Sequence, residues 1–247
     1  MIKKLSLFIG IIAVAWLFSS SCVWAQTLSI DVADQPTGSA TARIFNIIML
    51  ITVLSIAPSI LVMMTSFTRI VVVFSITRSA LSTNSTPPNM VLISLALFLT
   101  MFIMAPVFEK SWEEGIKPMI DEKVEIMEGL EKAANPLKEF MVKNTREKDL
   151  LLFSDISQEK TADTIEETPL KVAVPAFMIS ELRRAFEIGF LIFIPFLIID
   201  MVIASILMSM GMMMLPPTTI SLPFKILLFI LADGWNLVIN SLVQTFY

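Results

Sequence analysis

Five methionines stand within seven residues at the end of a long apolar run. The stretch reads Met-Ser-Met-Gly-Met-Met-Met over 208–214 and is followed by Leu-Pro-Pro. Methionine is unbranched and polarizable, so it fills a gap whose shape changes. The cluster is typical of an adaptable apolar seal between helices, and ordinary packing remains the alternative. Its members are Met208, Met210, Met212, Met213 and Met214.

Two carboxylates, Asp200 and Asp233, lie inside apolar stretches. Ionisable residues within membrane spans are costly and are functional candidates for that reason. Asp200 could carry a proton. We favour a structural partner for it, such as an arginine from another span or subunit.

A stripe of polar residues follows the second carboxylate. Asp233, Asn236, Asn240 and Gln244 are spaced by three, four and four residues, which places them on one helix face. Such a face meets a neighbouring helix or a wet cavity and not lipid. Interhelical hydrogen bonding is the interpretation we favour.

Other charges lie next to the apolar runs. The spacing of Glu181 and Arg184, and of Arg183 and Glu187, predicts ion pairs on one helix, with pairing across subunits as the alternative. Arg69 ends an apolar run, and we expect it to snorkel to the membrane interface.

Enzymatic chemistry is not expected. The chain has no histidine, which removes the usual general base and the commonest metal ligand. It carries no zinc-protease, P-loop, nucleophile-elbow or dinucleotide motif. No basic patch suits nucleic acid. We therefore expect no enzyme, no cofactor, no metal and no nucleic-acid partner.

Composition places the chain among membrane proteins. It is 55% apolar and 16% charged, and most of the charge falls between 109 and 171. A membrane crossing needs about 20 apolar residues. Four runs of that length are present, at 44–64, 90–108, 188–210 and 224–246.

The N-terminus has the pattern of a secretory signal peptide. Two lysines precede an apolar stretch, and Ala25 ends it. We predict cleavage after Ala25, which defines 1–25 as the signal and 26–43 as a polar linker. A lipoprotein signal that uses Cys22 is the alternative.

These features predict an all-α membrane protein with two helical hairpins, 44–108 and 172–247, each turned by a Pro-Pro pair. The segment 109–171 is predicted to be extracytoplasmic, acidic and helical. Within it, apolar residues three and four apart indicate an amphipathic helix that Asn135-Pro136 breaks.

The signal peptide would place 26–43 and 109–171 in the periplasm and both turns in the cytoplasm. Arg69 and Arg78 would then lie in the first cytoplasmic connection and Lys225 in the second, which agrees with the positive-inside rule.

Several stretches of the sequence together resemble the export-gate family of flagellar type III secretion. The likeness covers about 44–108 and 170–247. It is carried by Ser-Phe-Thr-Arg-Ile at 66–70, Thr-Pro-Pro-Asn at 86–89, Pro-Ala-Phe-Met-Ile-Ser-Glu-Leu at 175–182, Gly-Phe-Leu-Ile-Phe-Ile-Pro-Phe-Leu-Ile-Ile-Asp at 189–200, the methionine cluster and Asp-Gly-Trp at 233–235.

The resemblance implies a homo-oligomer in the bacterial inner membrane, at the flagellar basal body. It would join the small subunits FliQ and FliR in a channel for unfolded flagellar proteins, with the methionine cluster as the gasket. In a simple topology the four hydropathy spans would be surrounded by membrane lipids. The resemblance also implies that they can be held partly above the bilayer, inside the assembly.

Two other functions stay open from the residues alone. A proton- or ion-coupled carrier would use Asp200 and Asp233. A Cu(I) transporter would use thioether sulfurs as soft ligands, although such sites usually recruit cysteine or histidine as well.

Overall fold

The computed structural model describes residues 44–246, except 46, 50, 53–54, 57–58, 60–61, 84, 159–167 and 213. The chain divides into two units, Met1–Val53 and Leu54–Tyr247. The predicted signal peptide and polar linker lie outside the described residues. In the predicted first span, the described residues are helical as far as Met63. All the helices named below belong to the second unit.

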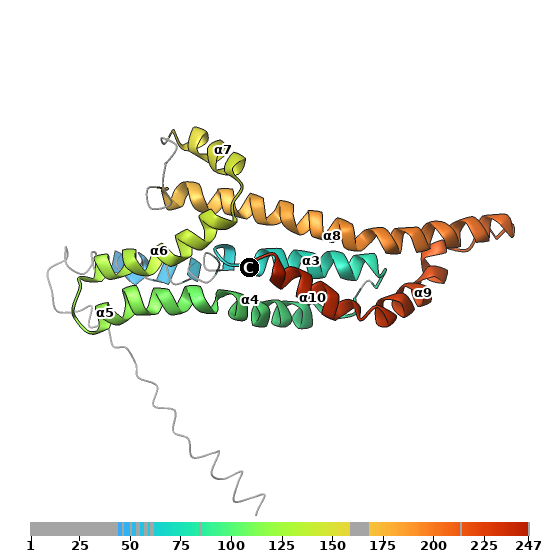
Figure 1. Cartoon of the computed structure of the whole chain (residues 1–247), viewed down its shortest axis with the longest axis horizontal. Coiled ribbons are helices and arrows are strands. Elements are labelled where there is room, and N and C mark those ends of the chain that lie inside the picture. Colours follow the sequence, from blue (N-terminus) through green and yellow to red (C-terminus); the bar gives the residue numbers. More distant parts are fainter. Residues whose placement is uncertain are drawn as a thin grey trace, which may run out of the picture. The chain divides into compact units, whose positions relative to one another are not determined.

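Every regular element in the described part of the second unit is helical, as predicted (Figure 1). In chain order the elements are α3 (Phe67–Ala80), α4 (Asn89–Ser111), a π-helical turn (Trp112–Ile116), α5 (Lys117–Ile120), α6 (Ile126–Asn144), α7 (Glu147–Ser157), α8 (Leu170–Ser209), α9 (Pro217–Leu231) and α10 (Gly234–Gln244).

Two described helices are long and apolar enough to cross a membrane, Asn89–Ile120 and Leu170–Ser209. The pair α9 and α10 gives a third candidate only if both helices count as one span, because they bend by 62° between them. The predicted fourth span, 224–246, is therefore wrong as one continuous helix. Helix α8 has 40 residues, or about 60 Å of length, which is twice the roughly 30 Å of hydrocarbon.

Helix α3 lies where the sequence predicted only a connection between the first two spans. Its buried residues include Ile70, Val73, Phe74, Thr77 and Ala80, whose spacing of three and four is that of one helix face. This face packs mainly against α8 and α4. The helical period was hidden because polar residues, Arg69 and Thr77, stand on the buried face of the helix.

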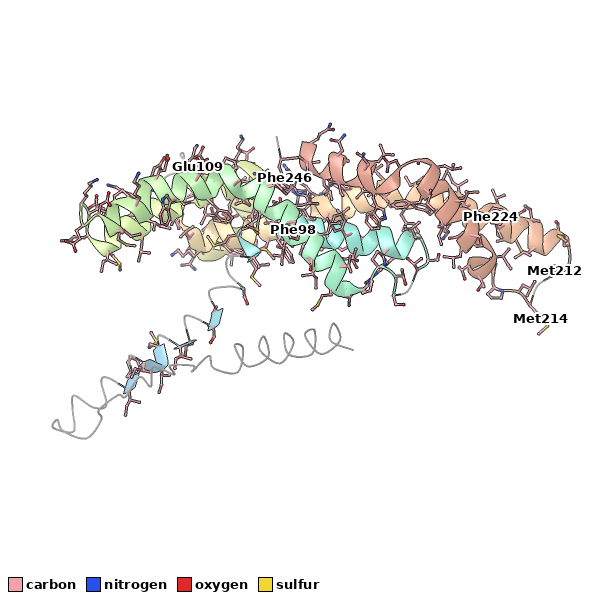
Figure 2. All side chains as sticks on the ribbon, turned by 90° about the horizontal axis from the view of Figure 1, so that it is seen from below. Phe98, Glu109, Met212, Met214, Phe224 and Phe246 are labelled. Atoms are coloured by element: carbon pink, nitrogen blue, oxygen red, sulfur yellow. The ribbon has the colours of Figure 1, made fainter. Side chains whose placement is uncertain are left out.

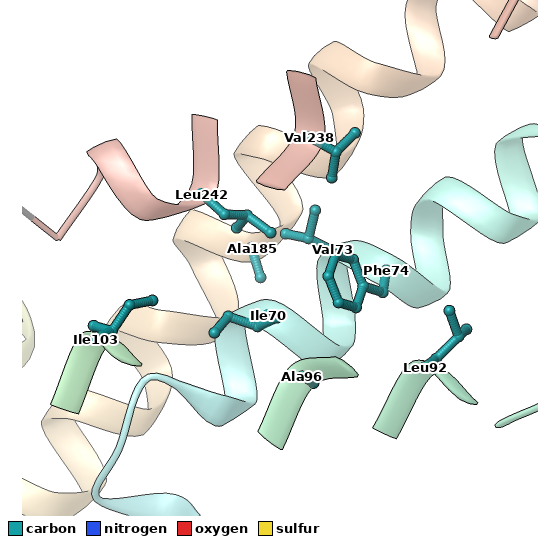
Figure 3. Close-up of a cluster of buried hydrophobic side chains, with 9 residues drawn as sticks. All are labelled: Ile70, Val73, Phe74, Leu92, Ala96, Ile103, Ala185, Val238 and Leu242. Atoms are coloured by element: carbon teal, nitrogen blue, oxygen red, sulfur yellow. The ribbon is translucent and has the colours of Figure 1, made fainter. Parts of the chain in front are cut away.

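One buried apolar cluster joins four helices of the second unit (Figure 3). It consists of Ile70, Val73 and Phe74 of α3, Leu92, Ala96 and Ile103 of α4, Ala185 of α8, and Val238 and Leu242 of α10. The bend before α10 also positions Trp235, whose ring packs edge-on against Phe74 at 6.0 Å and against Phe229 at 5.3 Å. The short helix α10 is thus part of the core.

The charged segment differs from its prediction at Pro136. Helix α6 runs through this proline without ending, so the predicted break is wrong. Proline removes one backbone hydrogen bond and kinks a helix, and here the flanking turns stay helical because α6 packs against α4 and α8. The predicted helix after Trp112 continues α4 and ends at Ile120.

Candidate functional site

The methionine-rich segment begins inside α8 and continues into the loop before α9. Gly211 has a φ of 73°, a conformation that glycine adopts without a Cβ clash. Its N–H donates to the Met208 carbonyl at 3.1 Å, and the Met212 N–H donates to the Leu207 carbonyl at 3.0 Å. These two bonds form the Schellman motif that ends many helices. The glycine therefore turns the chain out of α8 at a fixed point within the methionine run.

The methionine side chains of this segment are exposed within the single chain. The exposed fractions are 60% for Met208, 62% for Met210, 44% for Met212 and 98% for Met214. Met213 lies outside the described residues. Figure 2 shows Met212 and Met214 at the end of the unit beyond α8 and α9, away from Phe246. An exposed apolar group of this kind marks a surface that something else covers.

A buried ion pair ties α3 to α8 and to the C-terminal residues. The side chains of Arg69 and Glu181 are both fully buried. The Arg69 Nε donates to Glu181 Oε2 at 2.8 Å, and Nη2 donates to Oε1. Its Nη1 donates to Thr245 Oγ1 at 2.8 Å, and the guanidinium lies 3.7 Å from the centre of the Phe246 ring.

This geometry corrects two predictions. Arg69 does not snorkel, because the two-pronged bond to a carboxylate offsets much of the cost of burying its charge. Glu181 pairs with Arg69 and not with Arg184. The predicted pair between Arg183 and Glu187 is confirmed at 2.7 Å on the exposed side of α8.

A second ion pair joins α8 to α9. Lys225, predicted to lie in the connection between the last two spans, is buried within α9 with 1% of its surface exposed. Its Nζ donates to Asp200 Oδ2 at 2.6 Å, to Ser82 Oγ at 2.8 Å and to the Ala80 carbonyl at 3.1 Å. All three ammonium protons have acceptors. The Ser221 hydroxyl donates to Asp200 Oδ1 at 2.5 Å.

The partner of Asp200 is therefore a lysine of the same chain. This agrees with the structural role that we favoured for Asp200, although the residue is not the arginine named as an example. The sequence could have suggested Lys225, since it stands alone among apolar residues and such a charge needs a counterion.

The polar stripe of α10 faces outward in the single chain. Asp233, Asn236, Asn240 and Gln244 are all exposed. Asp233 precedes the helix with a φ of 48°. None of the four side chains forms a hydrogen bond within the described part of the chain. The stripe is thus available to a neighbouring chain or to a wet cavity.

A third charged cluster joins α7 to α8 and was not predicted. The carboxylate of the buried Asp149 accepts hydrogen bonds from Ser180 Oγ at 2.6 Å and Arg146 Nε at 2.9 Å. Burial alone raises the pKa of this carboxyl, but the two hydrogen bonds and the Arg146 charge outweigh it, so the pKa is lowered from its usual value. The spacing of Arg146 and Asp149, three residues apart, was the available signal.

These features define an all-helical protein with membrane-length apolar helices, buried ion pairs and an exposed methionine loop. Among the described residues, no group of three or more His, Cys, Asp or Glu could hold a metal.

The family model described as the FliP family matches residues 50–242, and the chain therefore belongs to the FliP family. It is 50% identical to the flagellar biosynthetic protein FliP of Rhizobium meliloti (strain 1021), over 94% of this chain and 96% of that protein. It is 56% identical to the protein of the same name from Bacillus subtilis (strain 168), over 87% and 96% of the two chains. Membership of this family means that the chain is not an enzyme, as expected.

Proposed function

We propose that the chain is a subunit of the flagellar type III protein export gate in the inner membrane. Copies of the chain, together with FliQ and FliR, would form the channel for unfolded flagellar proteins. The loop around Gly211 would be its gasket. The observation that carries this proposal is the exposure of four methionines at a fixed helix end in a chain of the FliP family.

The geometry of the loop suits a gasket. The Schellman motif at Gly211 fixes where the chain leaves α8, while the methionine side chains beyond it remain adaptable. Several such loops brought together would make a hydrophobic constriction, which excludes water and ions when it closes. A passing unfolded chain would displace flexible side chains more easily than stiff ones.

The buried ion pairs would position the helices around this channel. Asp200 already has a lysine and a serine as partners, which supports a structural role over that of a proton carrier. The carrier hypothesis would then rest on Asp233 alone. The exposed stripe of α10 would face neighbouring subunits or the channel lumen.

The topology also remains a proposal. A signal peptide cleaved after Ala25 would place 26–43 and 109–171 in the periplasm, with the chain folded as two helical hairpins. N-terminal sequencing of the mature protein should then begin at Gln26 or very near it. A retained Met1 would contradict this topology.

The assembly can be tested in a flagellated species from which its own copy of the gene has been deleted. A tagged version of this chain should restore secretion of flagellar proteins. Purified in mild detergent, it should carry untagged copies of itself together with FliQ and FliR. Recovery of a monomer free of both subunits, from cells that still secrete, would overturn the proposal.

A further inference from the structure

A pocket of about 170 Å³ lies between α4 and α6, distant in sequence from the methionine loop and the ion pairs. Its walls combine apolar side chains with three charged ones. They are Pro106, Val107, Lys110, Pro136, Glu139, Phe140 and Lys143. We propose that this pocket binds the headgroup of an anionic phospholipid.

Charge complementarity supports an anionic ligand. The two ammonium groups exceed the single carboxylate by one positive charge. Within the described residues, neither Lys110 nor Lys143 forms an ion pair, even though Glu139 lies one helical turn from Lys143. A phosphate diester would supply the missing counter-charge to both lysines.

The position of the pocket along α4 supports a lipid over a free phosphate. The helix carries no charge from Asn89 to Phe108. Glu109 and Lys110 follow, and of these two only Lys110 lines the pocket. Lysine at the end of an apolar helix places its ammonium at the membrane interface while its stem stays on apolar surface. The headgroup site thus lies where the apolar run of α4 ends.

An apolar track leads from this pocket along α4. Phe98, Phe102, Pro106 and Lys110 follow one another at intervals of four residues and are all exposed, so they lie near one face of the helix. Figure 2 labels Phe98 and Glu109 on this helix. From Phe98 to Lys110 the rise is about 18 Å, close to the roughly 15 Å of one leaflet. An acyl chain can follow the track while its phosphate meets the lysine.

The wall of the pocket is held firmly. Gly115, just beyond Lys110, lies against the backbone of α6, and a Cβ there would come within 2.3 Å of the Ala133 nitrogen. This close approach fixes α6 against the continuation of α4. The headgroup would therefore enter a preformed site.

The test is native mass spectrometry of the full chain in detergent, titrated with phosphatidylglycerol or with phosphatidylcholine of the same acyl chains. The wild type should bind phosphatidylglycerol preferentially. The double variant Lys110→Gln/Lys143→Gln should lose about fivefold in affinity for each lysine removed. Glu139→Gln should strengthen binding, because it removes the opposing charge.

The matched control is Lys117→Gln/Lys148→Gln, which removes two exposed lysines outside the pocket and should leave the preference unchanged. An equal preference in the pocket variant and the wild type would overturn the proposal. Displacement of the lipid by millimolar inorganic phosphate would reassign the pocket to free phosphate. Loss of oligomers with unchanged lipid adducts would assign it to a second copy of the chain.

Discussion

Removing the carboxylate of Glu181 should destabilise the second unit strongly, because Arg69 would stay buried without its counterion. Both side chains are fully buried, and breaking such a pair costs roughly 3–5 kcal/mol. In a chain of this size each kcal/mol lowers Tm by about 2–4 °C. Glu181→Gln should therefore lower Tm by roughly 6–20 °C. The lower part of that range is expected, since Thr245 and Phe246 still contact the guanidinium.

The matched control lies on the same helix. Glu187→Gln breaks the pair with Arg183, in which both side chains are more than half exposed, and should leave Tm almost unchanged, because solvent screens an exposed pair. Both Tm changes can be measured by thermal unfolding of the full chain in detergent, monitored by far-UV circular dichroism. The double variant Arg69→Met/Glu181→Leu should recover much of the loss, because apolar residues often replace a buried pair without cost. A Tm shift in Glu181→Gln no larger than in Glu187→Gln would refute the reasoning.

Three further predictions follow from the other sites. Gly211→Ala should destabilise the end of α8 by about 1 kcal/mol, because alanine disfavours the left-handed backbone, and Gly211→Asn should cost less in the same thermal assay. Lys225→Met should cost about 3 kcal/mol by leaving Asp200 with only a hydroxyl partner; unchanged unfolding would contradict the buried pair. Because the folded pKa of Asp149 is lowered, the advantage of the wild type over Asp149→Asn should be full above pH about 4 and fade as the pH falls further. A constant difference from pH 7 to pH 3 would be inconsistent with that shift.

Composition predicted the broad features of the fold because the bilayer imposes them. The apolar run 90–108 lies within α4, and the run 188–210 lies within α8 except for its last residue, since a chain with so few charges has to bury its backbone polar groups in helices. Hydropathy does not fix where such a helix ends. Helix α8 therefore begins at Leu170, well before its predicted span.

The partner of Arg69 could not be assigned from the sequence because the two members of this buried pair are far apart along the chain. Arg69 and Glu181 are separated by 112 residues, so the local spacing of Glu181 and Arg184 suggested the wrong partner. The same limit applies to Lys225 and Ser82. Composition identified the charges that need a partner, and only the packing of α3 against α8 identified that partner.

Hydropathy alone also could not predict the bend before α10. Residues 224–246 are apolar enough for one span, yet the positive φ at Asp233 breaks the helix. Aspartate tolerates this conformation better than most residues, and Asp-Gly is a common turn dipeptide. The local signal was therefore present but was outweighed by the length of the apolar run.

The measurement that tests the central claim most directly is the ion permeability of cells that express the assembled gate. Replacing Met212, Met213 and Met214 by alanine removes apolar bulk from the loop and adds no charge. The gasket account predicts that this variant assembles normally but leaks small ions, because the hydrophobic constriction no longer closes. Leucine at the same positions, similar in volume but stiffer, should leak less than alanine and slow export. An unchanged permeability in the alanine variant, with assembly confirmed, would contradict the account. It would mean that these methionines only pack against neighbouring surfaces.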